Sequence, residues 1–144
     1  MINYLISMFG YEILKKKKIQ TINNHLQYIF NMAKIDYVID VGANEGQFAS
    51  SLRRNNYKGN ILSFEPASKP FKKLVENSKH DAYWDVINLA LGEKKESRKI
   101  NVFEASDLNS FYEASELGKN RLNNGMKKIK TEMIEIKTLD SILK

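Results

Sequence analysis

The chain has 144 residues, 42% of them hydrophobic and 28% charged, which is enough for one soluble domain with a core and too apolar for a disordered protein. It contains no cysteine, which excludes disulfides, thiolate metal sites and cysteine nucleophiles and agrees with a reducing compartment. The net charge of +6 comes mostly from lysines near the two ends, so we interpret it as solvated lysine surfaces, with a nucleic-acid groove as the less favoured alternative.

Residues 1–34 are predicted to form a helical segment in front of the main domain. Apolar side chains recur at helical spacing over 2–14 and again over 19–33, which predicts two helices packed outside a sheet. A membrane-surface helix beside Lys15–Lys18 is the alternative. No apolar run is long enough to span a bilayer, and the lysine cluster follows the first apolar stretch, which is the reverse of a secretory signal. We therefore expect a cytoplasmic protein without a membrane span.

Residues 35–144 are predicted to form one domain in which strands and helices alternate. Three strands are predicted, at Tyr37–Val41, Ile61–Phe64 and Val86–Leu91, and the first of them is expected to be buried on both faces. A helix between the first two strands ends near Asn55 and has Phe48, Ala49 and Leu52 on one side. A second helix, between the last two strands, is capped by Ser68, and its inward side chains are Phe71, Leu74, Val75 and Ser78. Alternation with short connections indicates parallel pairing, so we predict an α/β fold with a Rossmann-like sheet and flanking helices.

The alternation of elements loosens after Gly92. Ile100–Phe103 is predicted to be a strand entered from a charged hairpin at 93–99, and 107–124 to be a loop with a short helix. The alternating pattern of Ile134–Lys137 indicates a half-exposed antiparallel strand. A polar stretch before the loop either lines a substrate pocket or forms a capped turn; its residues are Ser106, Asp107, Asn109 and Ser110.

The segment from Asp40 to Gly46 carries the strongest functional signal. A glycine turn that leads from a buried strand into a helix lies at the carboxyl end of the sheet, where glycines let a ligand approach the main chain. Glu65 follows the neighbouring strand, and a carboxylate there can accept both hydroxyl groups of a ribose. This arrangement indicates a ligand that contains adenosine.

Spacing within the turn favours S-adenosylmethionine over a dinucleotide. The fingerprint G-x-G-x-x-G, started at Gly42, requires glycine at two further positions, which hold Asn44 and Gln47. Asp40 places a carboxylate near the strand end, which is unfavourable for a pyrophosphate and suits the ammonium and sulfonium charges of S-adenosylmethionine. The alternative interpretation is that the glycines serve only a tight turn.

Four motifs occur in order along the chain: Asp40-Val41-Gly42-Ala43-Asn44-Glu45-Gly46, Phe64-Glu65-Pro66, Ala90-Leu91-Gly92 and Thr138-Leu139-Asp140. Together they resemble the FkbM family of class I S-adenosylmethionine-dependent methyltransferases, from about Ile35 to the last residue. The resemblance implies a cofactor site with Asp40, Gly42, Asn44 and Gly46 around the methionine half, Glu65 on the ribose, and Pro66, Ala90 and Leu91 near the adenine. Ala43 is also assigned to this cofactor site. It also implies methyl transfer to a hydroxyl of a sugar or secondary metabolite, and it assigns no catalytic residue.

Members of that family continue beyond the T-L-D segment into a strand with a K-x-D-x-E-G motif, whereas this sequence ends at Lys144. We therefore expect a fragment whose first strand has an unpaired, self-associating edge and which does not turn over by itself. His25 and His80 are isolated, so we expect no metal site. The alternatives to an enzyme are a non-catalytic cofactor-binding fragment and, less favoured, a basic nucleic-acid-binding protein.

Overall fold

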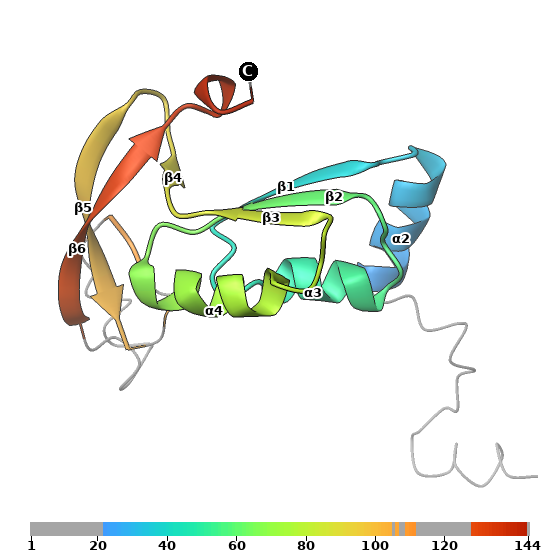
Figure 1. The fold of residues 1–144 in the computed structure, drawn as a ribbon, viewed down its shortest axis with the longest axis horizontal. Coiled ribbons are helices and arrows are strands. Elements are labelled where there is room, and N and C mark those ends of the chain that lie inside the picture. The colour runs from blue at the N-terminus through green and yellow to red at the C-terminus, as the bar shows by residue number, and fades with distance from the viewer. Residues whose placement is uncertain (1–21, 105, 107–108, 112–127, 144) are drawn as a thin grey trace, which may run out of the picture.

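A computed structural model of the chain describes residues 22–104, 106, 109–111 and 128–143 (Figure 1). The first predicted helix, over 2–14, lies outside these residues. The elements in chain order are α2 (Ile22–Met32), β1 (Tyr37–Val41), α3 (Gln47–Arg54), β2 (Asn60–Phe64), α4 (Ser68–Ser78), β3 (Trp84–Ile87), β4 (Ala90–Leu91), β5 (Glu96–Phe103), β6 (Lys128–Lys137) and the 3-10 helix η3 (Leu139–Ser141). Within the described ranges, no helix has the length and apolar character needed to cross a membrane.

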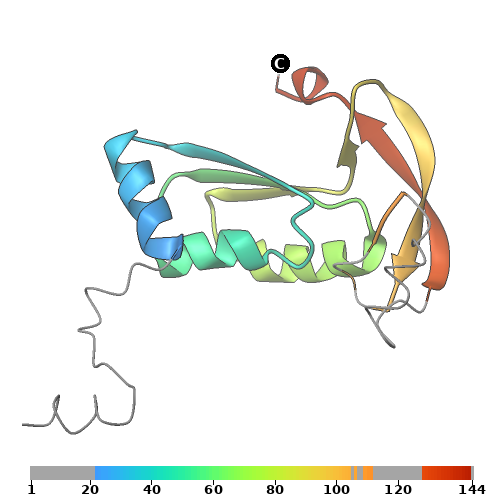
Figure 2. The ribbon, with the colours of Figure 1, turned by 180° about the vertical axis from the view of Figure 1, so that it is seen from behind.

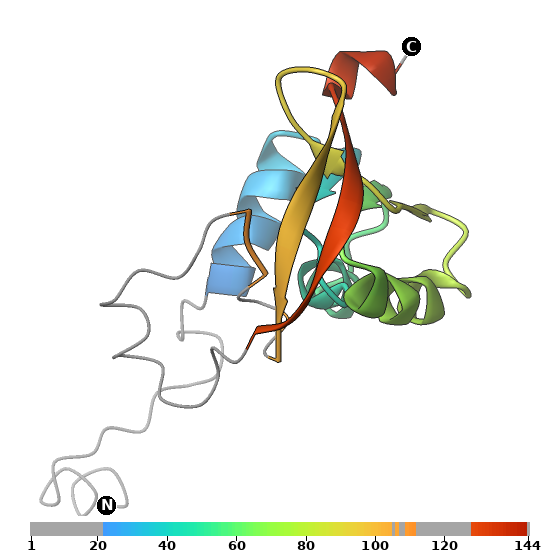
Figure 3. The ribbon, with the colours of Figure 1, turned by 90° about the vertical axis from the view of Figure 1, so that its left-hand side faces the viewer.

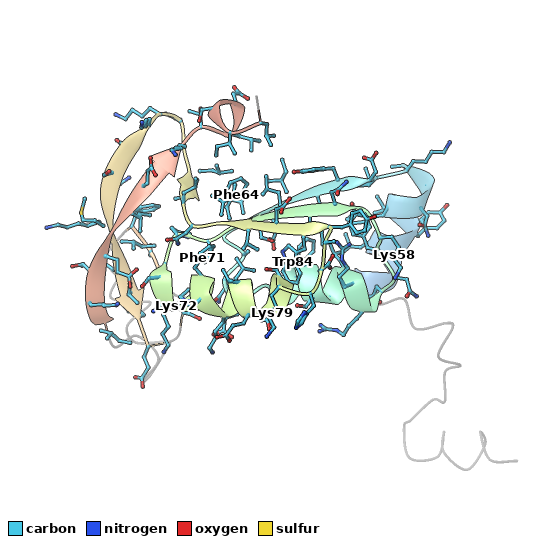
Figure 4. All side chains as sticks on the ribbon, in the orientation of Figure 1. Lys58, Phe64, Phe71, Lys72, Lys79 and Trp84 are labelled. Atoms are coloured by element: carbon cyan, nitrogen blue, oxygen red, sulfur yellow. The ribbon has the colours of Figure 1, made fainter. Side chains whose placement is uncertain are left out.

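The strands β1, β2 and β3 form a parallel sheet in that order, which confirms the predicted α/β class. Their register places Val41 beside Phe64 and Phe64 beside Ile87, so the three carboxyl ends meet at one edge. Helices α3 and α4 cover the same face of this sheet, as the front and back views show (Figures 1 and 2). Trp84 points to the helix-covered face and Phe64 to the opposite one (Figure 4).

Strand β1 is less buried than its apolar sequence predicts. Tyr37 is 45% exposed and Val41 is 59% exposed, so the prediction of a strand buried on both faces is wrong for its two ends. The reason is its position, because β2 is the one strand paired with β1 in the part of the chain that is described. The expected unpaired edge is therefore present, while self-association through it stays a prediction.

A second sheet, with the order β4-β6-β5, stands beside the first, and β5 and β6 run side by side in it (Figure 3). The strand predicted at 86–91 is in fact two strands, one in each sheet. They separate at Asn88, whose side-chain amide donates to the carbonyl oxygens of Glu65 and Pro66 at 2.8 and 3.0 Å. The antiparallel pairing and alternating burial of Ile134–Lys137 are confirmed, although β5 and β6 are both longer than predicted.

The beginning of α4 is capped differently from the prediction. Ser68 is the first helical residue, and Ala67 before it supplies no side-chain cap. The carboxylate of Glu132 on β6 instead accepts hydrogen bonds from the Ser68 backbone N–H and hydroxyl at 2.9 and 2.8 Å. Burial raises the pKa of Glu132, but hydrogen bonds from Lys130 and Ser68 outweigh it and leave the pKa lowered. A strand distant in sequence therefore satisfies the helix terminus.

Two side chains predicted to face the core are exposed. Phe48 on α3 is 41% exposed and Val75 on α4 is also 41% exposed, because both lie at the margins of their helices' apolar stripes. Ala49 and Leu74 on these helices are fully buried and pack with Trp84 between helices and sheet. These contacts hold the connections at the strand ends in place.

Candidate functional site

A cavity of about 370 Å³ lies at the carboxyl ends of β1 and β2, bounded on its other side by the second sheet. Small-molecule sites usually measure about 300–1,000 Å³, so the cavity is large enough for a cofactor. Its lining residues are Val41, Gly42, Asn44, Phe64, Glu65, Pro66, Leu89, Ala90, Leu91, Ile100, Ser106, Asn109, Ser110 and Phe111. Another cavity, between α2 and α3, measures about 30 Å³, which is room for about one water molecule.

Hydrogen bonds donated by its backbone N–H groups hold the loop from Gly42 to Gly46 in place. Both glycines have positive φ angles, 76° and 88°, and Asn44 shares this left-handed conformation at 50°. The N–H groups of Gly42 and Ala43 both donate to the carbonyl oxygen of Phe64 at 2.9 Å. Those of Asn44 and Gly46 donate to the Glu65 carboxylate and the Ala43 carbonyl, both at 2.8 Å. These four N–H groups are therefore already used within the protein.

Glu65 links the loop to the end of β2. Its side chain is nearly buried, with 6% of the residue exposed. One carboxylate oxygen accepts the N–H of Asn44 and the other accepts the N–H of Ala67, each at 2.8 Å. Burial raises the pKa of Glu65 despite these two hydrogen bonds, and the negative charge of Asp40 acts in the same direction. Each carboxylate oxygen retains a lone pair, so Glu65 can still accept a hydroxyl group on each side.

Asp40 lies beside the cavity and outside its lining. The Ser63 hydroxyl donates to Asp40 Oδ2 at 3.3 Å, and Trp84 Nε1 donates to Ser63 Oγ at 2.9 Å, so one chain of hydrogen bonds crosses all three parallel strands. Burial raises the pKa of Asp40, while the hydrogen bond from Ser63 opposes that effect. Asp40 therefore contributes negative potential beneath the loop without lining the cavity.

Of the predicted site residues, six line the cavity: Gly42, Asn44, Glu65, Pro66, Ala90 and Leu91. Ala43 is buried, and Gly46 faces the core, where a Cβ atom would lie 2.8 Å from the side chains of both Leu74 and Trp84. The absence of a side chain at Gly46 thus serves close packing, whereas a Cβ at Gly42 would meet nothing within 4 Å. The two glycines have different physical roles.

The second sheet and the segment that follows β5 complete the cavity. Sequence patterns had identified some of these residues and missed others. The polar stretch was recognised, and Ser106 Oγ now donates to Asn44 Oδ1 at 3.0 Å, which connects it to the glycine loop. Ser106, Asn109 and Ser110 line the cavity, and Asn109 Oδ1 also accepts the Phe103 N–H at 3.0 Å. Asp107 lies outside the described residues, and the role of this stretch in substrate binding stays a prediction. Ile100 and Phe111 had no local signal for a site: Ile100 lies on β5, and Phe111 follows Ser110, which bridges to Asn101 on that strand.

The cavity has acidic rather than basic character. Among its described lining residues Glu65 is the ionisable side chain, and no lysine or arginine belongs to that set. The occupied loop N–H groups offer little to a phosphate, which binds at helix ends through free backbone donors. The described wall therefore suits a neutral or cationic ligand with hydroxyl groups.

Comparison with known proteins yields one match. A family model described as the methyltransferase FkbM domain matches residues 40–144. The matched range contains the glycine loop, Glu65 and both sheets except the first residues of β1. No curated protein and no solved structure matches the chain significantly.

Proposed function

The chain belongs to the FkbM methyltransferase family, and from this membership we propose that it binds S-adenosylmethionine and methylates a hydroxyl oxygen of a sugar or another small molecule. The observation that carries the proposal is the hydrogen-bonded state of the glycine loop. A dinucleotide pyrophosphate needs free backbone donors at this turn, and here those donors serve Phe64, Glu65 and Ala43. The carboxylates of Glu65 and Asp40 favour a cationic ligand instead.

The residues that would hold the cofactor follow from the cavity wall. Glu65 would accept the ribose hydroxyls, the apolar wall of Pro66 and residues 89–91 would cover the adenine, and Gly42 and Asn44 would face the methionine half. When bound, S-adenosylmethionine supplies an electrophilic methyl group on a sulfonium. The protein's own contribution is to hold both reactants in line and to exclude water, because this transfer needs no covalent intermediate.

We expect S-adenosylmethionine and S-adenosylhomocysteine to bind and NAD not to bind. The physical reason is that the loop lacks spare donors for a pyrophosphate and lies against the Glu65 carboxylate. Isothermal titration calorimetry with the three ligands under one buffer condition measures this. A preference for NAD would overturn the proposal, and heat from none of the three would favour the alternative of a chain without this cofactor site.

Glu65→Ala is expected to weaken S-adenosylhomocysteine binding by about 1–3 kcal/mol, the scale of hydrogen bonds to a charged acceptor. Since Glu65 also holds the N–H groups of Asn44 and Ala67, the variant's melting temperature is measured without ligand to separate loop loosening from lost contacts. Glu93→Ala is the matched control, because Glu93 is an exposed carboxylate outside the cavity. Unchanged affinity in a folded Glu65→Ala protein would show that the Glu65 carboxylate does not bind the ligand.

A further inference from the structure

The proposed ligand has a carboxylate in its methionine half, and the cavity must supply a donor for it. The backbone of the glycine loop does not offer one, since its N–H groups donate to Phe64, Glu65 and Ala43, and that of Glu45 donates to Gln47 Oε1. The described lining also lacks lysine and arginine, and Glu65 has the wrong charge. A carboxylate can only accept hydrogen bonds, so the donor must be a side chain of the wall, and the amides of Asn44 and Asn109 are the candidates.

Asn109 has such a donor. Its side-chain nitrogen Nδ2 is buried and has no hydrogen-bond partner, the one such side-chain atom among the described residues. The orientation of the amide is fixed by Oδ1, which accepts the backbone N–H of Phe103 at 3.0 Å. A reversed amide would place the Nδ2 donor against the Phe103 N–H, which is also a donor. A buried polar atom without a partner costs free energy, and a ligand oxygen would remove that cost.

The neighbours of Asn109 place it on the correct side of the cavity. Its backbone N–H donates to the Ser106 carbonyl at 3.3 Å, and the Ser106 hydroxyl donates to Asn44 Oδ1 at 3.0 Å. Asn44 belongs to the loop that would face the methionine half of the ligand, whereas the apolar residues 89–91 would cover the adenine in the proposed complex. Asn109 and the glycine loop thus belong to one connected wall.

We propose that the Asn109 amide binds the α-carboxylate of the cofactor's methionine half and thereby makes the site selective for ligands that carry this group. The proposal rests on the proposed function, because it assumes an S-adenosylmethionine-type ligand. Asn109 is then a specificity-determining residue supplied by the segment after β5, outside the glycine loop and the parallel sheet.

The test compares two commercially available probes, S-adenosylhomocysteine and 5′-methylthioadenosine, which lacks the amino-acid half. Asn109→Asp keeps the oxygen that accepts the Phe103 N–H and replaces the donor by a second acceptor with negative charge. We expect it to weaken S-adenosylhomocysteine binding by about tenfold or more, with methylthioadenosine affinity changed by less than about twofold. Asn60→Asp, at an exposed position away from the cavity, controls for the added charge.

Asn109→Ala is the second variant, since it adds no charge and is expected to lose the same preference for S-adenosylhomocysteine. Melting curves show which variants are folded, and either folded variant decides the question. Equal weakening of both probes, or no change in either, overturns the role of Asn109 while the proposed function stands. Failure of wild-type protein to bind either probe defeats the proposed function itself, so the two failures are distinguishable.

Discussion

Gly46→Ala is expected to lower the free energy of unfolding by about 2–5 kcal/mol, which is more than we expect for Gly42→Ala in the same loop. Two costs combine at this position. An alanine at a φ angle of 88° costs about 1–2 kcal/mol in backbone strain. Its Cβ would also lie 2.8 Å from Leu74 and Trp84 in the core between helices and sheet, and such overpacking costs about 1–3 kcal/mol. Urea or guanidinium unfolding curves measure the change.

The matched control is Gly42→Ala in the same loop. Its φ angle of 76° carries a similar backbone cost, but a Cβ there meets nothing within 4 Å. We therefore expect a loss of only about 1–2 kcal/mol in the free energy of unfolding. Equal losses in the two variants would show that packing against Trp84 does not distinguish these glycines.

Arg53→Ala is expected to lower the free energy of unfolding by about 2–4 kcal/mol, because one guanidinium connects three separate segments. Its Nε donates to Asp81 Oδ2 at 2.6 Å. Its terminal nitrogens donate to the backbone carbonyls of Tyr57, Gly59 and Tyr83 at 2.9, 2.9 and 3.0 Å. The variant leaves the partly buried carbonyls of Tyr57 and Gly59 without this donor, whereas the Tyr83 carbonyl also accepts the Ile61 N–H. Arg53→Lys retains the charge but cannot reach all these acceptors, so we expect most of the loss to remain.

The acid dependence of stability gives a second readout of the same group. The side-chain hydrogen bond from Arg53 lowers the pKa of Asp81 from its ordinary value of 3.8. The pair's contribution is therefore fully present above pH 3.8 and is lost as the pH falls through the lower folded pKa. Unfolding curves between pH 7 and pH 3 should show the difference between wild type and Arg53→Ala narrowing toward the acid end, while the share from the backbone carbonyls remains. Arg54→Ala, at the exposed neighbouring position, should parallel wild type throughout.

Short-range patterns were sufficient for the half of the domain around the glycine loop. Strand β1, helix α3 and strand β2 follow within a residue or two of their predicted bounds, because apolar runs and the glycine turn are local signals. The position of Glu65 at the end of β2 follows for the same reason, since parallel strands that alternate with short helices align their carboxyl ends. The family was also recognisable from these motifs and is confirmed by the match over 40–144.

Tertiary structure alone decided how the remaining elements complete the site. Strand β4 leaves the first sheet because it pairs with β6, which lies far along the chain, and no local pattern encodes a partner at that distance. The same pairing brings Glu132 to the first turn of α4 in place of the Ser68 cap that the sequence suggested. Asn109 is held at the cavity by the hydrogen bond from Phe103 and by the bridge between Asn101 and Ser110, and its amide nitrogen has no partner there. The local sequence therefore determined the glycine loop and Glu65 on one side of the cavity. Long-range strand pairing determined the opposite wall, because hydrogen bonds between distant segments depend on the whole chain.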